Sequence, residues 1–308
     1  MIFMDIISKA VDAAASEFQT VACRIDEPMR EHTSFRIGGP VRAMYFPKTA
    51  EEAADIFHHF SSFGITPLVL GNGTNMLVED AKPLDIVAVN TSGLNDIELI
   101  DNEKIVAGAG VALSKLALFA YEHCLSGLEF AHGIPGTLGG AVVMNAGAYG
   151  AEMKDIIYRT DAFNMENGYY AVVNDEHEFS YRHSRFTDNS DIILSSAIKA
   201  VEKDSTGIKA LMDELNRKRR ESQPLDMLSA GSTFKRPAGG YAAELIEQAG
   251  LKGYEAGGAK VSQKHAGFVV NTGGATFSDV MAVIDHVIER VYIETGIELE
   301  PELKIIRG

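Results

Sequence analysis

The stretch GIPGTLGGAVVMNAGAYGAE, residues 133–152, constrains the fold most, because it holds six glycines and no charged side chain before Glu152. A loop in water would be polar, so this composition predicts a mostly buried segment whose backbone packs against something flat or large. Gly139 and Gly140 would let backbone amides approach a pyrophosphate or a flat ring system, and Ala146 would leave room for it. From these residues alone, a glycine-rich buried β corner remains the alternative.

A second glycine segment, GNGTN at residues 71–75, directly follows the apolar run PLVL. Two glycines permit positive φ, and successive backbone N–H groups in such a turn form a concavity that binds anions. Thr74 and Asn75 add hydroxyl and amide donors. The segment favours a phosphate-binding turn, with an ordinary strand–turn–strand connection as the alternative.

The net charge of −15 over 308 residues disfavours nucleic acid and anionic membranes as partners, although locally concentrated cations still allow an anionic small molecule. No apolar run approaches the ~18 residues of a membrane span. Residues 1–18 have the pattern of an amphipathic helix and lack that of a signal peptide. Cys23 and Cys124 lie far apart and are expected to be reduced, buried thiols. We therefore expect a cytoplasmic protein.

The common motifs for phosphate, metal and acyl-transfer chemistry are missing. The chain has no G-x-G-x-x-G, no Walker loop, no C-x-x-C, no H-E-x-x-H and no G-x-S-x-G elbow. His58 and His59 lie on an apparently amphipathic segment, which favours packing or surface positions over metal ligation. We predict no metal site, and these absences argue against a metal hydrolase or a Rossmann dehydrogenase.

The apolar pattern predicts an α+β protein. Residues 36–80 have the pattern of a strand–helix–strand unit, whose helix begins with a capping box formed by Thr49 and Glu52. Between residues 85 and 203, five short apolar runs are predicted to be strands, with one helix at 113–124 among them. The order of these predicted strands and the helix is irregular, unlike a repeating βαβ series.

A charged helix at 205–222 is predicted to connect this part to the C-terminal portion, so we place a boundary near residue 204. The portion beyond it contains a clear amphipathic helix at 277–296. Its apolar positions follow the helical period: Val280, Val283, Ile284, Val287, Ile288 and Val291.

The stretch LSAGSTFKRP, residues 228–237, combines two serines, a glycine, an aromatic residue and two cations. It suits a simple turn, and it equally suits a site that sets a hydroxyl beside an anion-binding pair. Residue types alone leave Ser229 and Ser232 interchangeable.

Seven segments in order resemble the UDP-N-acetylenolpyruvoylglucosamine reductase family, from about residue 32 to the end of the chain. They are TSFRIGGP (33–40), LGNGTNMLV (70–78), GIPGTLGGAVVMNAGAYG (133–150), FSYRHSRF (179–186), SAGSTFKRP (229–237), HAGFVVN (265–271) and LEPELKII (299–306). The passage after the glycine run resembles the subtype that lacks an extra tyrosine-bearing loop.

The resemblance implies an α+β fold in which FAD is bound by a two-lobed domain of the vanillyl-alcohol-oxidase (PCMH) type, followed by a C-terminal α+β substrate-binding domain. Residues 1–30 would form an N-terminal helix and residues 31–203 the FAD domain, with lobes of about 31–84 and 85–203. Residues 204–308 would bind substrate. The implied reaction reduces UDP-N-acetylglucosamine enolpyruvate to UDP-N-acetylmuramate with NADPH, a step in peptidoglycan precursor synthesis.

The resemblance also implies a catalytic trio. Arg182 would hold the substrate carboxylate, because a guanidinium fork matches a carboxylate and stays charged. Ser232 would donate a proton to the enolate, and Glu302 would stabilise or protonate the same intermediate. Spacing alone does not separate these three from their neighbours Arg185, Ser229 and Glu300.

The remaining implied site residues fall into two groups. The cofactor-binding group is Arg36, Gly71, Asn72, Gly73, Thr74, Asn75, Gly133, Gly136, Thr137, Gly139, Gly140, Asn145, Ala146 and Gly147. The substrate-binding group is Tyr149, Lys235, Arg236 and His265, with Lys235 and Arg236 assigned to the diphosphate.

Two departures from the family pattern affect substrate affinity more than chemistry. His32 stands where asparagine is common, and Ser222 stands where lysine is frequent, so a cation for the substrate phosphate is either missing or replaced by Arg220. One rival function is that of an alcohol or sugar oxidase of the same fold, often with flavin attached to a histidine near residues 71–75. No histidine lies between His59 and His123, which argues against it. The other rival is a non-catalytic nucleotide-sugar binding protein, which the presence of the trio disfavours.

Overall fold

The computed structural model describes residues 5–101 and 103–308, and this chain divides into two compact units. Unit 1 comprises Met1–Ile25, Arg42–Asn72 and Ile86–Lys218; unit 2 comprises Asp26–Val41, Gly73–Asp85 and Arg219–Gly308. Two N-terminal segments therefore pack with the C-terminal third of the chain. These units describe how the chain packs and do not say which part binds which ligand. The functional domain boundaries at residues 30, 84 and 203 therefore stay a prediction.

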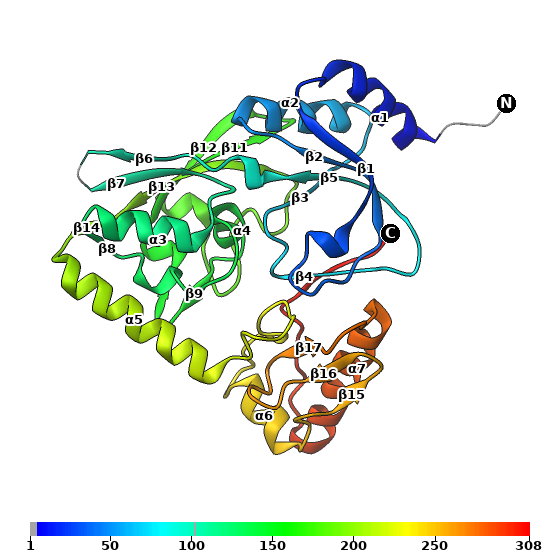
Figure 1. Ribbon diagram of the computed structural model, residues 1–308, viewed down its shortest axis with the longest axis vertical. Coiled ribbons are helices and arrows are strands. Elements are labelled where there is room, and N and C mark those ends of the chain that lie inside the picture. The colour runs from blue at the N-terminus through cyan, green and yellow to red at the C-terminus, as the bar shows by residue number, and fades with distance from the viewer. Residues whose placement is uncertain (1–4, 102) are drawn as a thin grey trace. The chain divides into compact units, whose positions relative to one another are not determined.

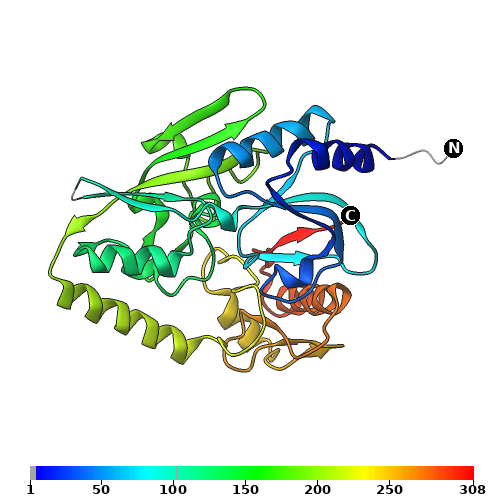
Figure 2. The ribbon, with the colours of Figure 1, turned by 45° about the horizontal axis from the view of Figure 1, so that its top comes forward.

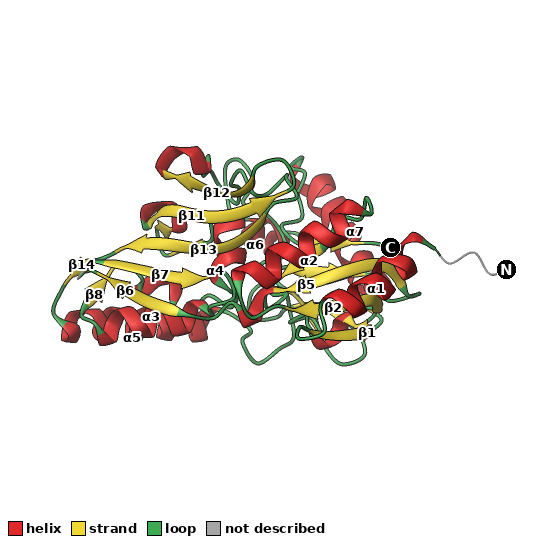
Figure 3. Cartoon of the chain, turned by 90° about the horizontal axis from the view of Figure 1, so that it is seen from above, coloured by secondary structure: helices red, strands yellow, loops and turns green. Residues whose placement is uncertain are grey.

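Two sheets dominate the N-terminal two thirds. Their strands are β1 (Ala22–Pro28), β2 (Pro40–Phe46), β3 (Leu68–Leu70), β5 (Leu84–Asn90), β6 (Ile97–Ile100), β7 (Lys104–Gly108), β11 (Ile157–Asn164), β12 (Gly168–Val173) and β13 (Ile192–Lys199). One sheet has the order β1-β2-β5-β3. The other is antiparallel, with the order β12-β11-β13-β7-β6, as Figure 3 shows. The five predicted strands are confirmed, and the apolar pattern missed β1 and β11 of these two sheets.

Short pairs and helices complete unit 1. The pairs are β8 (Leu125–Ser126) with β14 (Val201–Glu202) and β9 (Gly147–Ala148) with β10 (Ala151–Glu152). The α-helices are α1 (Ile6–Glu17), α2 (Ala50–Ser62), α3 (Leu113–Glu122), α4 (Leu138–Val143) and α5 (Ser205–Ser222), the last running into unit 2. The 3-10 turns of the chain are η1 (Met29–Glu31), η2 (Thr91–Gly93), η3 (Glu129–Ala131), η4 (Met153–Asp155) and η5 (Asn174–His177).

The predicted capping box of α2 is half right. The Thr49 side chain accepts a hydrogen bond from the Glu52 backbone N–H at 3.2 Å, as expected. The Glu52 carboxylate instead accepts from the Lys48 N–H at 2.7 Å, one residue before the N-cap. The predicted amphipathic helix at residues 1–18 is observed as α1, and residues 1–4 of that prediction lie outside the described residues. The wider prediction of a helix over residues 1–30 is wrong beyond α1, since residues 22–28 form β1.

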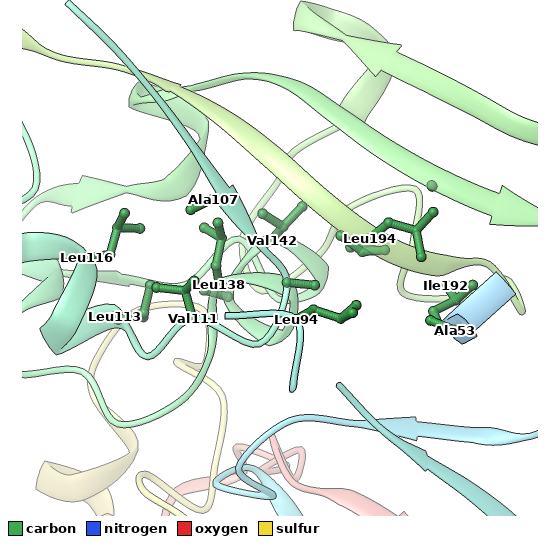
Figure 4. Close-up of a cluster of buried hydrophobic side chains, with 14 of the residues drawn as sticks. Ala53, Leu94, Ala107, Val111, Leu113, Leu116, Leu138, Val142, Ile192 and Leu194 are labelled. Carbon is green, nitrogen blue, oxygen red and sulfur yellow. The ribbon is translucent and has the colours of Figure 1, made fainter. Parts of the chain in front are cut away.

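The glycine run enters the core of unit 1 through α4, which packs on β7 and β13. Figure 4 labels part of this core: Ala53, Leu94, Ala107, Val111, Leu113, Leu116, Leu138, Val142, Ile192 and Leu194. Burying an aliphatic side chain such as Leu138 or Val142 contributes about 1.5–3 kcal/mol, which anchors the run. The prediction of a mostly buried run fails at its far end, since Tyr149 and Gly150 are exposed.

Unit 2 is a smaller α+β body. Its elements are β4 (Met76–Val78), α6 (Ala242–Gln248), β15 (Glu255–Ala256), β16 (Ala259–Val261), β17 (Val269–Asn271), α7 (Phe277–Thr295) and β18 (Lys304–Ile306). The sheet order is β15-β16-β17, and α7 packs on all three strands with α6 beside it (Figure 1). The predicted helix 277–296 is confirmed, with Val280, Val283, Ile284, Val287 and Val291 buried. It ends at Gly296, whose φ of 71° suits glycine.

The two strands that flank residues 71–75 belong to different sheets. β3 pairs in parallel with β5, whereas β4 pairs in parallel with the C-terminal β18. Figure 2 shows the red strand β18 beside the cyan strand β4. The turn therefore connects two strands without forming a hairpin, because it ends one pairing and begins another. A phosphate-binding role for the turn stays a prediction.

Two surface properties complete the fold. Cys23 and Cys124 are exposed, so the expectation of buried thiols is wrong. Cys23 lies on β1, the outermost strand of its sheet, and Cys124 follows α3 at a turn with φ of 57°. Among the described helices, none combines the length and apolarity needed to cross a membrane.

Candidate active site

Gly71 and the exposed Gly140 lie beside Thr137 in unit 1, and these residues are the candidate cofactor surface. A β-carbon on Gly71 would lie 2.2 Å from Thr137 Oγ1, so only glycine fits there. Gly140 differs, since its β-carbon would meet only Thr137 Oγ1, at 3.7 Å, and the residue is exposed. Glycine inside a helix costs about 1 kcal/mol relative to alanine, and protein packing does not explain it at Gly140. An open backbone of this kind fits the close approach of a bulky cofactor such as FAD.

Polar residues that sequence reasoning missed hold this surface from behind. Asn90 Nδ2 donates to the Gly71 carbonyl at 3.4 Å, and Thr91 Oγ1 donates to the Leu70 carbonyl at 3.2 Å. Both residues are buried. The sequence feature that could have identified them is the polar pair Asn90–Thr91 directly after the apolar residues of β5, since buried polar side chains need hydrogen-bond partners.

The other half of the 71–75 turn is built in unit 2. A β-carbon on Gly73 would lie 2.1 Å from the His32 carbonyl oxygen, and the Ser34 N–H donates to the Gly73 carbonyl at 3.2 Å. His32 Nε2 lies 2.7 Å from Glu27 Oε1. The departure at His32 therefore has a structural role, because the histidine anchors the loop against which Gly73 packs. Arg36 is in the same loop, exposed, with its Nη1 3.4 Å from Glu31 Oε2.

Asn75 and Glu302 are brought together in unit 2. Asn75 Nδ2 donates to the Glu302 carbonyl at 3.2 Å, and the Lys304 N–H donates to the Asn75 carbonyl at 2.9 Å. The Glu302 N–H donates to the Thr233 carbonyl at 2.8 Å. The predicted cofactor residue Asn75 thus holds the backbone of a predicted catalytic residue.

Glu300 and Glu302, which spacing did not separate, have different surroundings. Glu300 is exposed and its carboxylate pairs with Lys235, whose N–H also donates to the Glu300 carbonyl at 2.9 Å. Glu302 is half-buried. Glu300 thus forms a surface ion pair with Lys235, whereas the catalytic role of Glu302 stays a prediction.

Ser232 lies beside His265 across Gly267. A β-carbon on Gly267 would lie 3.1 Å from His265 Cε1 and 3.4 Å from Ser232 Oγ. The Gly267 N–H donates to His265 Nδ1 at 3.2 Å, which leaves the proton of the neutral ring on Nε2. Burial lowers the pKa of His265, so the ring is neutral at pH 7.

The two substrate cations predicted at 235 and 236 have local partners. Lys235 pairs with Glu300, as above, and the Arg236 guanidinium lies 4.3 Å from the Tyr241 ring centroid. Residues on α5 are similarly engaged, since the Arg220 carbonyl accepts from Lys264 Nζ at 2.5 Å. These contacts leave the diphosphate assignment of Lys235 and Arg236 a prediction.

Tyr149 and Arg182 lie on two tight turns of unit 1. Ala148 pairs with Ala151, so Tyr149 and Gly150 are the central residues of a hairpin turn, with φ of 57° and 90°. Positive φ at both positions suits Asn-Gly, and a tyrosine there costs about 1–2 kcal/mol. Arg182 has φ of 56° in the turn closed by the Ser180–His183 bridge. Strain of this kind is retained where a side chain must be aimed.

Arg182 and Arg185 are separated by their contacts. The Arg182 guanidinium lies 5.1 Å from the Tyr181 ring centroid, at the tip of its turn. Arg185 turns back to the scaffold, where Nη1 lies 3.5 Å from the Glu176 carbonyl and the guanidinium lies over Tyr170. These contacts distinguish the two arginines, and the role of Arg182 as the carboxylate ligand stays a prediction.

The rest of the glycine run serves the backbone. Gly136 has φ of 131° and its carbonyl accepts from the Leu113 N–H at 3.1 Å. A β-carbon on Gly139 would lie 2.9 Å from Ala109 Cβ, so packing requires this glycine. The Ala146 carbonyl accepts from the Met153 N–H at 3.0 Å. Of the other predicted cofactor residues, Gly147 begins β9, and three lie in turns or bends: Asn72, Thr74 and Gly133.

Two family models match the chain. The model of the FAD binding domain matches residues 41–172, and the model of the UDP-N-acetylenolpyruvoylglucosamine reductase C-terminal domain matches residues 223–306. Together they bear out the α+β class and the order of a PCMH-type FAD domain followed by a C-terminal domain.

Whole-chain relatives carry the same name. A UDP-N-acetylenolpyruvoylglucosamine reductase of Caldanaerobacter subterraneus subsp. tengcongensis is 48% identical over 282 residues, covering 92% of this chain and 93% of its own length. One of Clostridioides difficile is 42% identical over 283 residues, with coverage of 92% and 93%.

A solved structure of the same reductase from Thermus caldophilus is 31% identical, with a TM-score of 0.79 and coverage of 93% of this chain and 99% of that one. An alkyldihydroxyacetonephosphate synthase, 14% identical with a TM-score of 0.50, covers 63% of this chain and 43% of its own and shares the fold alone. On the strength of the close relatives, the chain belongs to the UDP-N-acetylenolpyruvoylglucosamine reductase family of FAD-containing oxidoreductases.

Proposed function

We propose that this chain reduces UDP-N-acetylglucosamine enolpyruvate to UDP-N-acetylmuramate, with FAD as cofactor and NADPH as reductant. The observation that carries the proposal is family membership over 92% of the chain together with the presence of Arg182, Ser232 and Glu302. When bound, FAD supplies the hydride that reaches the methylene carbon C3 of the enolpyruvyl group. The net change adds that hydride at C3 and a proton at C2.

Arg182 binds the substrate carboxylate in this proposal. Negative charge develops on C2 and the adjoining carboxylate as the hydride arrives, so a fixed cation there stabilises the transition state more than the ground state. Its turn places a planar fork at a tip, and a fork can hold both carboxylate oxygens. Tyr149 supplies a second contact to the substrate from the neighbouring hairpin.

Ser232 delivers the proton to C2. A free hydroxyl is a very weak acid, so it needs a strongly basic acceptor such as the enolate and a prearranged partner. His265 lies across Gly267 from the hydroxyl, and its neutral ring contributes a hydrogen-bonding group and no second charge. Glu302, whose backbone N–H donates to the Thr233 carbonyl and whose carbonyl accepts from Asn75 Nδ2, helps to stabilise the same enolic intermediate.

The residues present fit FAD. The exposed Gly140 and the paired Gly71–Thr137 contact leave backbone open to a bulky ligand. The cofactor would be held by this surface, by the 73–75 turn and by Arg36, as predicted from the resemblance. We further propose that residues 31–203 act as the FAD domain and residues 204–308 as the substrate domain.

The experiment is anaerobic stopped-flow absorbance of the purified flavoprotein. NADPH is expected to bleach the flavin, and the enolpyruvyl substrate is expected to restore its colour. Bleaching without restoration by purified substrate would refute the proposed function. Release of free flavin on denaturation would at the same time exclude the rival with covalently attached flavin.

The cellular setting follows from the substrate. We propose that the chain works in the cytoplasm in peptidoglycan precursor synthesis, and so supports cell-wall formation, cell shape and division. Depleting the chain should lead to accumulation of the enolpyruvyl nucleotide and to rounded, lysing cells. Unchanged nucleotide pools after depletion would contradict this setting.

A further inference from the structure

Asn145 is a buried polar residue whose side-chain amide is fully engaged as a donor. Nδ2 donates to Glu152 Oε2 at 2.8 Å and to the Ser180 carbonyl at 2.9 Å, and Oδ1 accepts from the Lys154 N–H at 3.0 Å. The residue is 0% exposed. An asparagine amide has two N–H groups, so neither is left for a cofactor.

The partners of Asn145 belong to two different turns. Glu152 lies in β10, so it ends the hairpin that has Tyr149 at its tip. Ser180 begins the turn that carries Arg182. One amide therefore bridges the segment that presents the tyrosine and the segment that presents the guanidinium.

Both turn tips need such a restraint. Tyr149 and Arg182 have φ of 57° and 56°, and Asn145 itself has φ of 41°. Non-glycine residues persist in this region only when their surroundings hold them there. The positive φ of these three residues therefore indicates that the surrounding contacts hold both turns in place.

Further contacts support the same bridge. Ser184 Oγ and Thr187 Oγ1 each donate to the Val143 carbonyl at 2.9 Å, which ties the far side of the Arg182 turn to the end of α4. The hydrogen bond from Lys154 lowers the pKa of Glu152 most, and the charge of Arg182 contributes as well. The Glu152 carboxylate thus lies within the field of the Arg182 guanidinium.

We propose that Asn145 is a positioning residue that holds the Tyr149 hairpin and the Arg182 turn in one register, and that its side chain makes no contact with FAD. This replaces the cofactor role that the resemblance implied for Asn145. It rests on the proposed function, since the two turns matter because they meet the enolpyruvyl substrate.

The test is Asn145→Asp in the purified holoenzyme. Aspartate has nearly the same shape but presents an oxygen to Glu152 and to the Ser180 carbonyl, so both donated hydrogen bonds are lost. FAD content and the rate of bleaching by NADPH are expected to stay unchanged. The substrate concentration for half-maximal reoxidation should rise, and the reoxidation rate should fall, by on the order of 10–100-fold, because a small misplacement of a binding group costs that much.

Asn174→Asp is the matched control, since Asn174 is another asparagine with positive φ in unit 1, and it is exposed. It should leave both half-reactions unchanged. In the double variant Asn145→Asp/Glu152→Gln, the glutamine amide donates to the new carboxylate and restores one of the two hydrogen bonds. Substrate affinity should therefore recover in part, which a general loss of stability would not do.

Three results would overturn the proposal: loss of FAD from Asn145→Asp, equal slowing of both half-reactions, or an unchanged substrate half-reaction. If Asn145→Asp gives no folded protein, Glu152→Ala removes one acceptor on the hairpin side and should raise the substrate requirement with FAD retained; no rise would equally overturn the proposal. A wild-type enzyme that substrate does not reoxidise would refute the proposed function instead, so the two failures are distinguishable.

Discussion

The Arg182 turn and the Ser232 segment hold their functional side chains by different means. Arg182 stands on a strained turn whose register depends on the side chain of Asn145. Ser232 stands on a segment held by backbone bonds, since the Thr233 N–H donates to Gly267 and the Thr233 carbonyl accepts from Glu302, both at 2.8 Å. The Arg182 turn is thus held by side chains, chiefly the Asn145 amide with the Ser184 and Thr187 hydroxyls, and the Ser232 segment is held by backbone bonds among three chain segments.

The difference suits the two tasks. A long arginine carries its charge on a flexible stem, so aiming it requires a fixed turn. A serine hydroxyl reaches only a short distance from the backbone, so the backbone itself must be placed. Single side-chain substitutions should therefore impair the function of the Arg182 region. The Ser232 region should instead be sensitive to added bulk that displaces its backbone.

The largest effect is expected for Ser232→Ala. Bleaching by NADPH should stay near wild type, while reoxidation by substrate should slow by several powers of ten, each worth ~1.4 kcal/mol. Stopped-flow absorbance of both half-reactions measures this. Equal slowing of the two would indicate damage to the fold and remove the distinction between the regions.

Arg182→Lys should have the next largest effect. Lysine keeps the charge but loses the planar fork, so the substrate half-reaction should slow by on the order of 10²-fold. Steady-state kinetics would show a raised KM for substrate and an unchanged KM for NADPH. As a control, Arg185→Lys should leave substrate kinetics nearly unchanged, because Arg185 contacts the scaffold.

Gly267→Ala tests the steric sensitivity of the Ser232 segment. The new methyl group would press on the His265 ring and on Ser232 Oγ, so we expect the substrate half-reaction to slow about tenfold with FAD retained. Gly207→Ala is the matched control, because its β-carbon would meet only Lys203 Cε at 3.8 Å within α5. A normal rate for Gly267→Ala would show that this contact does not position the hydroxyl.

Tyr149→Asn, in the hairpin next to the Arg182 turn, should raise the stability of the protein and weaken its binding of substrate. Asparagine tolerates the positive φ of this turn, so the free energy of unfolding should rise by about 1 kcal/mol. The substrate requirement should rise as well, since the ring is lost. Denaturant melts and substrate kinetics on the same preparation check both; a destabilised variant would show that the tyrosine packs and is not strained.

The smallest effect concerns His177, which is buried beside the Arg182 turn. Its Nε2 lies 2.9 Å from Thr160 Oγ1 and its Nδ1 2.8 Å from the Asn174 carbonyl. Burial lowers the pKa of His177 below the ordinary 6.5. As the pH falls, His177 therefore becomes protonated in the unfolded chain before it does in the folded chain. This contribution to stability should be complete above pH ~6.5 and should decline as the pH falls from there toward the folded-state pKa. Urea melts of wild type and His177→Gln should diverge in this acidic range; parallel curves would argue against it.

Local features of the fold could be predicted from the sequence. The apolar period and terminal glycine of α7 act within a few residues, and its limits were found almost to the residue. The pairing of β4 with β18 joins residues more than 200 positions apart, and no local pattern encodes it.

The candidate site shows the same limit. Residue types do not distinguish the two members of three pairs: Ser229 and Ser232, Arg182 and Arg185, and Glu300 and Glu302. Only the resemblance to the family selects one member of each. The structure adds the contacts of Arg185 with Tyr170 and of Glu300 with Lys235, and the choice within each pair stays a prediction. Asn145 was assigned by its place in a glycine motif, and only its hydrogen bonds reveal the bridging position.

The most direct test of the account is product analysis under anaerobic conditions. Purified holoenzyme is mixed with NADPH and UDP-N-acetylglucosamine enolpyruvate, and the nucleotide is analysed by mass spectrometry. The account predicts UDP-N-acetylmuramate, two hydrogens heavier than the substrate, formed one for one with NADPH consumed. Consumption of NADPH with the enolpyruvyl nucleotide unchanged would contradict it.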